Sequence, residues 1–203
     1  MVFVNLHNRY MLMRHAHSVA NEKHVIISHP SSGVSNFGLT PFGEKQVMEA
    51  IAHTNELYDV KQIYTSDFLR AYQTALLVAH ITKADVITDI RLRERFFGQF
   101  EGTDSENYHK VWNMDCKQEN SQICYDVEPL HSVAKRMLSF VLDCESYYVN
   151  TLLLIVSHGD PLQILFAKAN GLQPHQFRTL PHFANAEIRH LPSHFAIEKE
   201  YLS

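Results

Sequence analysis

The chain has 203 residues, of which 45% are hydrophobic, so it is long enough to bury the core of one α/β domain. Its 18 Lys and Arg residues are outnumbered by 22 Asp and Glu residues, which argues against nucleic acid or an anionic membrane as a partner. The N-terminus lacks the pattern of a secretory signal, and no apolar stretch has the length of a membrane span. We therefore expect a single domain over residues 1–203.

The three cysteines, Cys116, Cys124 and Cys144, are odd in number and lack CxxC spacing. This pattern argues against a disulfide framework and against a zinc cluster. A reducing cytoplasm is the simplest expected location.

Two apolar runs end at histidines. Residues 10–13 predict a buried strand that leads into Arg14 and His15, and residues 151–156 predict a second strand followed by His158. If the two strands are parallel neighbours, both imidazoles lie at the carboxyl edge of the sheet, where open α/β folds bind ligands. We expect one site at these two strand ends.

The segment after the first strand combines a loop with a helix. Residues 22–38 are rich in Pro, Gly and Ser and predict a loop that borders the site. Thr40 followed by Pro41 is typical of a helix start, and an apolar stripe extends the predicted helix to about residue 57. A short strand is expected over 61–65.

The next helix carries a cation in its first turns. Ser66 and Asp67 are predicted to cap a helix whose apolar stripe runs over residues 69–79. Arg70 opposes the helix dipole there, so we expect it to share an anion with the helix terminus.

The second half of the chain continues the alternation. A strand is expected over 85–88, followed by a lid-like insertion around 98–127 with a weak helix at 108–114. Helices are predicted over 130–148 and from 161 to about 169. Residues 186–191 and 194–199 predict a terminal hairpin. Alternating strands and helices indicate an α/β fold, a three-layer αβα sandwich with a mainly parallel central sheet.

The residues next to the predicted strand ends and helix starts suit phosphoryl transfer. Guanidinium groups bind anionic oxygens in bidentate fashion, a neutral imidazole can attack phosphorus, and a carboxylic acid can protonate a leaving oxygen. The chain supplies all three groups in Arg14, His15, Arg70, Glu94 and His158.

Four ordered motifs resemble those of the histidine phosphatase superfamily, in its phosphoglycerate-mutase-like branch. They are RHAHS with Asn21 (residues 14–21), YTSDFLRAYQTA (64–75), LRE with FGxFEG (92–102) and SHG (157–159), and LTxxGxxQ (39–46) adds a fifth. The resemblance implies that His15 is the phosphorylated nucleophile and that Glu94 donates the proton to the leaving group and then activates water. The residues that would hold the phosphoryl oxygens are Arg14, Asn21, Arg70 and His158. No metal and no organic cofactor are implied. Since His15 should be neutral and His158 cationic, their pKa values should differ.

Some positions depart from the family pattern. Ala16 stands where glycine is usual, so a turn that needs positive φ would be strained and activity would be low. Ser18 replaces a common threonine and keeps the hydroxyl. The Trp-bearing loop of phosphoglycerate mutases is missing between Asn21 and Leu39, and the stretch after Glu94 also differs, which favours hydrolysis over mutase chemistry.

Several histidines and carboxylates have rival interpretations. His17, His24 and His29 are candidate ligands of a metal site, but chance clustering among 14 histidines is the preferred explanation. His17 is alternatively a substrate contact. Glu101 and Asp104 compete with Glu94, although Glu101 is better explained as structural. Asn185 resembles a position near the family's site, but a turn-forming asparagine is the simpler interpretation.

The resemblance predicts a histidine acid phosphatase-type phosphomonoesterase that needs no cofactor and acts on a small phosphorylated metabolite. The alternatives are a phosphoglycerate mutase, a protein phosphohistidine phosphatase, and a non-catalytic module that keeps the phosphate pocket. The sequence does not indicate the oligomeric state.

Overall fold

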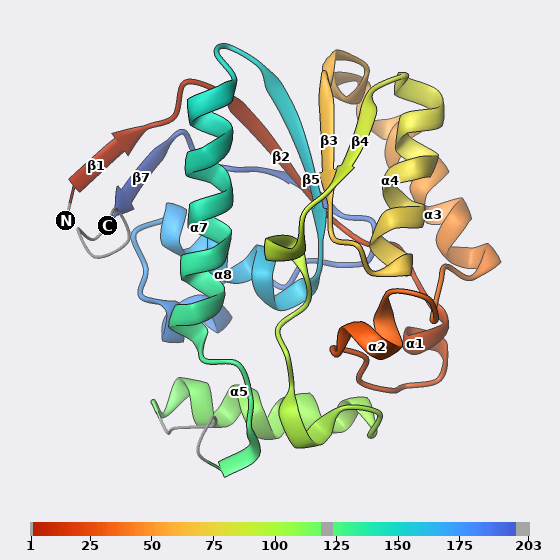
Figure 1. Cartoon of the computed structure of the whole chain (residues 1–203), viewed down its shortest axis with the longest axis vertical. Coiled ribbons are helices and arrows are strands. Elements are labelled where there is room, and N and C mark those ends of the chain that lie inside the picture. The colour runs from red at the N-terminus through yellow and green to blue at the C-terminus, as the bar shows by residue number, and fades with distance from the viewer. Residues whose placement is uncertain (1, 119–123, 198–203) are drawn as a thin grey trace.

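A five-stranded sheet forms the centre of the computed structural model, which describes residues 2–118 and 124–197 (Figure 1). The order is β4-β3-β5-β2-β6. The strands are β2 (Arg9–Arg14), β3 (Gln62–Thr65), β4 (Asp85–Thr88), β5 (Leu152–Ser157) and β6 (Ile188–His190). The first four are parallel and β6 runs antiparallel to β2. The predicted mainly parallel α/β sheet is confirmed.

Helices cover both faces of this sheet because the strand residues alternate between two apolar cores. The long helices are α3 (Pro41–His53), α4 (Leu69–Thr82), α7 (Leu130–Tyr147) and α8 (Gly159–Ala169). In β2, Tyr10 and Leu12 belong to the core that contains α7 and α8. Met11 and Met13 belong to the core that contains α3 and α4. The period of two along a strand therefore produces the three layers.

The helix boundaries agree with the predictions except at two ends. Helix α3 stops at His53 and continues as the 3₁₀ helix η1 (Asn55–Asp59). The predicted cap of α4 by Ser66 and Asp67 is wrong, because Phe68 is the N-cap residue and that helix has no side-chain cap. The hydroxyl of Ser66 accepts from the N–H of Phe68 at 3.2 Å, one residue before the helix. Asp67 instead accepts two hydrogen bonds from Arg93, at 2.8 and 2.6 Å.

The predicted terminal hairpin is also wrong. Strand β6 pairs with β2, whereas β7 (His194–Ile197) pairs with β1 (Val2–Asn5) in a separate two-stranded sheet that is visible at the left of Figure 1. The sequence does not indicate which strand either segment pairs with. In the structure, β6 pairs with the edge of β2 that β5 leaves free. Residues 198 and 199 of the prediction lie outside the described residues.

The segment after β4 leaves the sheet and builds a small core of its own. It contains the 3₁₀ helices η2 (Ile90–Leu92), η3 (Gly98–Phe100) and η4 (Ser105–Asn107), and the helix α5 (Tyr108–Cys116). Figure 1 shows α5 beyond the carboxyl ends of the strands. The small core consists of the buried apolar side chains of Ile26, Phe97, Phe100, Val111 and Val127.

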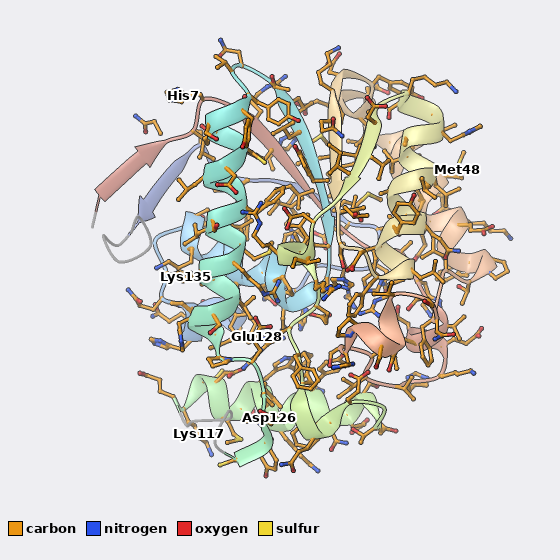
Figure 2. The ribbon with its side chains drawn as sticks, viewed as in Figure 1. His7, Met48, Lys117, Asp126, Glu128 and Lys135 are labelled. Atoms are coloured by element: carbon orange, nitrogen blue, oxygen red, sulfur yellow. The ribbon has the colours of Figure 1, made fainter. Side chains whose placement is uncertain are left out.

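Charged groups fasten this segment to the body of the protein. Arg95 is fully buried and binds both carboxylate oxygens of Asp115 on α5, at 2.6 and 2.9 Å. Its Nε donates to the carbonyl of Glu128 at 2.8 Å, and the Glu128 carboxylate accepts from Arg136 on α7. Figure 2 shows Glu128 just before α7. The lid-like role of residues 98–127 stays a prediction, as does the single domain over 1–203.

Two short helices follow β2, namely α1 (Val19–Glu22) and α2 (Pro30–Gly33), and the second lies inside the predicted loop over 22–38. The 3₁₀ helix η5 (Pro174–Thr179) follows α8. Within the described ranges, no helix combines the length and the apolar character needed to cross a membrane.

Candidate active site

The predicted site residues meet at the carboxyl edge of the sheet. His15 directly follows β2 and His158 directly follows β5, and these two strands are parallel neighbours. The two imidazole centroids lie 5.2 Å apart, with their planes at 61°. Residues far apart in the sequence are thus brought to one place, as the strand pattern predicts.

A cavity of about 360 Å³ opens at this edge. Five of the six predicted site residues line it, namely Arg14, His15, Asn21, Arg70 and Glu94. His158 is fully buried and packs edge-on against Phe68, with ring centroids 5.2 Å apart. His158 therefore lies behind the surface of the cavity, in contact with the residues that form it.

The hydrogen bonds of His15 place its proton on Nδ1 and leave a lone pair on Nε2. Nδ1 lies 2.8 Å from the carbonyl oxygen of Ala16, which only accepts, so Nδ1 carries the proton. Nε2 accepts from Nε of Arg70 at 3.0 Å. Burial, followed by the charges of Arg70 and Arg14, holds the pKa of His15 well below its usual value. His15 is thus a neutral imidazole with a defined tautomer.

Three buried nitrogens around His15 have no hydrogen-bond partner among the described residues. They are Nε of Arg14, Nη1 of Arg70 and Nδ1 of His158. Buried polar groups are normally paired, because an unpaired one costs roughly 1–3 kcal/mol. The backbone of Gly159 at the start of α8 also lines the cavity, and a helix N-terminus favours anions. This set of donors suits a tetrahedral oxyanion.

Asn21 is oriented by the helix cap at the start of α1. Its Oδ1 accepts from the backbone N–H and from the hydroxyl of Ser18, at 3.0 and 2.9 Å. Because Oδ1 is occupied, the amide nitrogen is the end of Asn21 that remains to donate to a ligand. Ser18 supplies the hydroxyl that this cap needs.

Asn185 lies in a turn, and its side chain also organises the site. Its amide donates to the carbonyl of His15 at 3.0 Å and to Oδ1 of Asn21 at 3.5 Å. The residue with a left-handed backbone is the next one, Ala186, whose φ is 59°. The N–H of Glu187 donates to the carbonyl of Ala184 at 3.2 Å and closes a turn that contains Asn185, so the turn-forming interpretation is confirmed. Only the resemblance to a family position pointed to the additional contact with His15.

Glu94 is 9% exposed and lies close to Arg70 and His158. Its Oε2 is 4.0 Å from Nη2 of Arg70 and 4.0 Å from Nδ1 of His158, and its Oε1 accepts from the backbone N–H of Arg95 at 2.9 Å. Burial, and next the charge of Asp160, raises the pKa of Glu94 to about 7. A carboxyl group with this pKa can both donate and accept a proton near neutrality.

The expected difference in pKa between the two imidazoles is not seen. Burial and the charge of Arg70 lower the pKa of His158 well below its usual value, as they do for His15. Both rings are surrounded by guanidinium groups, which oppose a further positive charge.

Ala16 introduces no backbone strain, which corrects the concern raised by the missing glycine. It is not among the residues with positive φ. Its side chain is fully buried in the core beside α3 and α4, and its N–H donates to the hydroxyl of Thr74 at 3.1 Å. An alanine therefore fits this backbone and fills space.

Replacing this alanine tests its structural role. We expect Ala16→Gly to lower the free energy of unfolding by about 1–2 kcal/mol, because it removes a buried methyl group and frees the unfolded backbone. Chemical denaturation measures the change, and catalytic turnover of the folded variant should match the wild type. A clear gain in turnover would show that alanine limits the site.

The fifth motif fixes the chain after the nucleophile. The carbonyl of His17 accepts from the N–H of Thr40 at 3.1 Å, and the N–H of His17 donates to Oε1 of Gln46 at 2.9 Å. A Cβ on Gly43 would lie 2.0 Å from that carbonyl, so only glycine allows this approach. His17 itself contacts Thr40 and Phe42 and does not line the cavity, so the substrate contact considered for it is not observed.

The other residues with rival interpretations, His24, His29 and Glu101, have different contacts. His29 bonds Ser31, whereas His24 lines the cavity. No three or more His, Cys, Asp or Glu side chains within 2–118 and 124–197 are placed to share a metal ion. Glu101 accepts from Ser28 and His29, at 2.7 and 3.0 Å, and so anchors the loop after β2.

Further cavity residues come from segments in which the sequence carried no motif. They include Ser105, Tyr108, Trp112, Asp160 and His182. Asp160 follows the SHG motif directly, which is the one local signal among them. Tyr108 and Trp112 lie in the predicted weak helix, and only the packing of α5 brings them to the site.

The family is shown by a model of the histidine phosphatase superfamily (branch 1), which matches residues 10–194. The chain belongs to this superfamily. A protein of Hydrogenobacter thermophilus named "Putative phosphoserine phosphatase 2" is 31% identical over 81% of this chain and 79% of its own length. The "Probable phosphoglycerate mutase GpmB" of Yersinia enterocolitica is 31% identical over 83% of this chain and 78% of its own length.

The fold also agrees with that of a solved structure. Bacillus stearothermophilus YhfR superposes with a TM-score of 0.76 and covers 90% of each chain, at 22% identity. The predicted resemblance to the superfamily is thus confirmed, and phosphatase or mutase chemistry is supported.

Proposed function

We propose that this histidine phosphatase superfamily member is a phosphatase that hydrolyses a small phosphomonoester through a phosphohistidine on His15. The observation that carries the proposal is the set of three unpaired buried nitrogens around a neutral imidazole, two of them on residues that line the same cavity as His15. Such donors lower the energy of a phosphoryl group whose charge is spread over its oxygens.

The first step would form the phosphohistidine. The substrate phosphate takes hydrogen bonds from Arg14, Arg70 and His158, and in doing so replaces His15 as a partner of Arg70. Nε2 of His15 then attacks phosphorus with its lone pair. The bond from phosphorus to the ester oxygen breaks, and Glu94 in its acid form gives its proton to the departing oxygen.

The second step would release phosphate. Glu94 is now a carboxylate and takes a proton from a water molecule, whose oxygen attacks phosphorus. The phosphorus–nitrogen bond breaks and His15 regains its lone pair. Asn21 and the N-terminus of α8 would hold the phosphoryl oxygens through both steps.

The direct test is hydrolysis of 4-nitrophenyl phosphate in the presence of EDTA. We expect turnover with and without the chelator, because the proposed chemistry uses only side chains of this chain. A metallohydrolase would lose activity with EDTA and regain it with zinc or manganese. The unpaired, widely spaced cysteines support a cytoplasmic location for this activity.

The mutase alternative has support in the names of several relatives. It predicts that 3-phosphoglycerate with a trace of bisphosphoglycerate yields 2-phosphoglycerate rather than free phosphate. The missing Trp-bearing loop between Asn21 and Leu39 supports hydrolysis instead. A protein phosphohistidine remains a further candidate substrate, and a phosphate-binding module without turnover is the candidate outside enzyme chemistry. The unstrained Ala16 removes the feature that favoured the module.

A further inference from the structure

The cavity has a second half that the phosphate donors do not form. We call it the leaving-group half, and it consists of Tyr108, Trp112, Asp160 and His182. If the proposed phosphatase function holds, the alcohol or phenol part of the substrate lies against these side chains. Their chemistry therefore bears on which phosphomonoesters are accepted.

One side of the leaving-group half is a fixed aromatic surface. The rings of Tyr108 and Trp112 stack with planes at 10° and centroids 5.2 Å apart. The guanidinium carbon of Arg178 lies 3.7 Å from the centroid of the Trp112 ring. The indole N–H donates to Oδ2 of Asp160 at 3.3 Å. Trp112 is thus held by contacts at its ring and at its N–H. With Tyr108 it gives this side of the cavity an aromatic lining against which an apolar ring can pack.

The charges beside this surface are compensated within the protein. Asp160 is 4% exposed, and its Oδ1 accepts from Nη2 of Arg178. Its Oδ2 lies 3.5 Å from Nη1 of Arg95, whose guanidinium also binds Asp115 at 2.6 and 2.9 Å. Two guanidinium groups and two carboxylates therefore neutralise one another.

A substrate carboxylate would be poorly placed here. It would approach Asp160, which lines the cavity, while Arg95 and Arg178 are already engaged with carboxylates. Nε of Arg178 has no hydrogen-bond partner among the described residues, but the charge of this guanidinium is already offset by Asp160. Burial of a further negative charge beside Asp160 is therefore costly, and like-charge contacts reject ligands strongly. Burial also lowers the pKa of His182 to about 4, so this imidazole is neutral near pH 7.

We propose that the leaving-group half selects phosphomonoesters of uncharged alcohols or phenols with a flat apolar face, and that it disfavours leaving groups that carry a carboxylate. Phosphoserine and phosphoglycerate, which occur in the names of relatives, would then be poor substrates of this chain.

The matched substrates are phenyl phosphate and 4-carboxyphenyl phosphate, which share one ring and differ by one carboxylate. We expect kcat/KM to be at least about tenfold lower for the carboxylated ester. Equal rates, or faster reaction of the carboxylated ester, would overturn the inference while leaving the phosphatase function intact. No hydrolysis of either ester would instead count against the proposed function itself.

Two variants should shift the ratio of the two rates in opposite directions. Asp160→Asn frees the charge of Arg178, so the discrimination against the carboxylate should shrink or reverse. Arg178→Gln leaves Asp160 less compensated, so the discrimination should grow. Because each ratio is taken within one variant, a general loss of activity cancels. If one variant does not fold, the direction of change in the other decides the matter.

The control is Asp126→Asn, which removes one negative charge from an exposed side chain outside the cavity (Figure 2). Its ratio should equal that of the wild type. A ratio that is unchanged in Asp160→Asn and in Arg178→Gln alike would show that the buried charges do not govern selectivity.

Discussion

His15→Ala should abolish phosphatase activity, with a loss of about 10⁴-fold or more in kcat. The expectation follows from geometry, because Nε2 of His15 carries a lone pair and lies 3.0 Å from Nε of Arg70, in the cavity that Arg14 and Arg70 also line. Without it, water would have to attack a bound phosphate directly. The assay is steady-state release of 4-nitrophenolate from 4-nitrophenyl phosphate.

A control variant separates loss of chemistry from loss of fold. His53→Ala removes an exposed imidazole from the end of α3 and should keep wild-type rates. His15→Ala should keep a cooperative thermal transition, and the wild type quenched in alkali should carry label from a radioactive substrate that the variant does not. Near wild-type turnover in His15→Ala would remove this residue from the mechanism.

Glu94→Gln should have an effect that depends on the leaving group. For an alkyl phosphate, we expect kcat/KM to fall by about 10²–10⁴-fold, because glutamine cannot protonate the departing alkoxide. With 4-nitrophenyl phosphate, phosphorylation of His15 should be much less affected, since nitrophenolate leaves as a stable anion. The slower water step should then give a burst of nitrophenolate. Rapid-quench kinetics measures both quantities.

The pH profile provides a second readout for this residue. The acid form of Glu94 prevails below its raised pKa of about 7, so kcat/KM for an alkyl phosphate should fall as the pH rises above about 7. The pKa of His15 is lowered, so His15 stays neutral through the weakly acidic range and limits the rate only at lower pH. In Glu94→Gln, the decline above pH 7 should disappear.

Glu101→Gln is the matched control, because Glu101 is the rival carboxylate in the same motif. It accepts hydrogen bonds from Ser28 and does not line the cavity. Its variant should keep the decline above pH 7 and the dependence on a proton donor. If Glu101→Gln lost that decline and Glu94→Gln kept it, the proton donor would be Glu101 and the assignment to Glu94 would be wrong.

The sequence by itself determined the central fold and predicted the residues of the half of the site that we propose to bind phosphate. Apolar runs that alternate with amphipathic helices predict a covered parallel sheet, and reactive groups directly after two such runs lie at its carboxyl edge. Both inferences depend on local patterns, which survive folding because neighbouring residues stay neighbours. His15 and His158 follow their strands directly, so their meeting required only that β2 and β5 be adjacent.

Only the tertiary structure decided the backbone of Ala16, the partners of β6 and β7, and the leaving-group half of the cavity. Asp160, Arg178 and Trp112 contact one another although no motif links their positions. Such contacts depend on how α5 and α8 pack against η5, and packing is set by the summed burial of many side chains rather than by a local pattern. The charge that a substrate meets beyond its phosphate is therefore a property of the folded molecule.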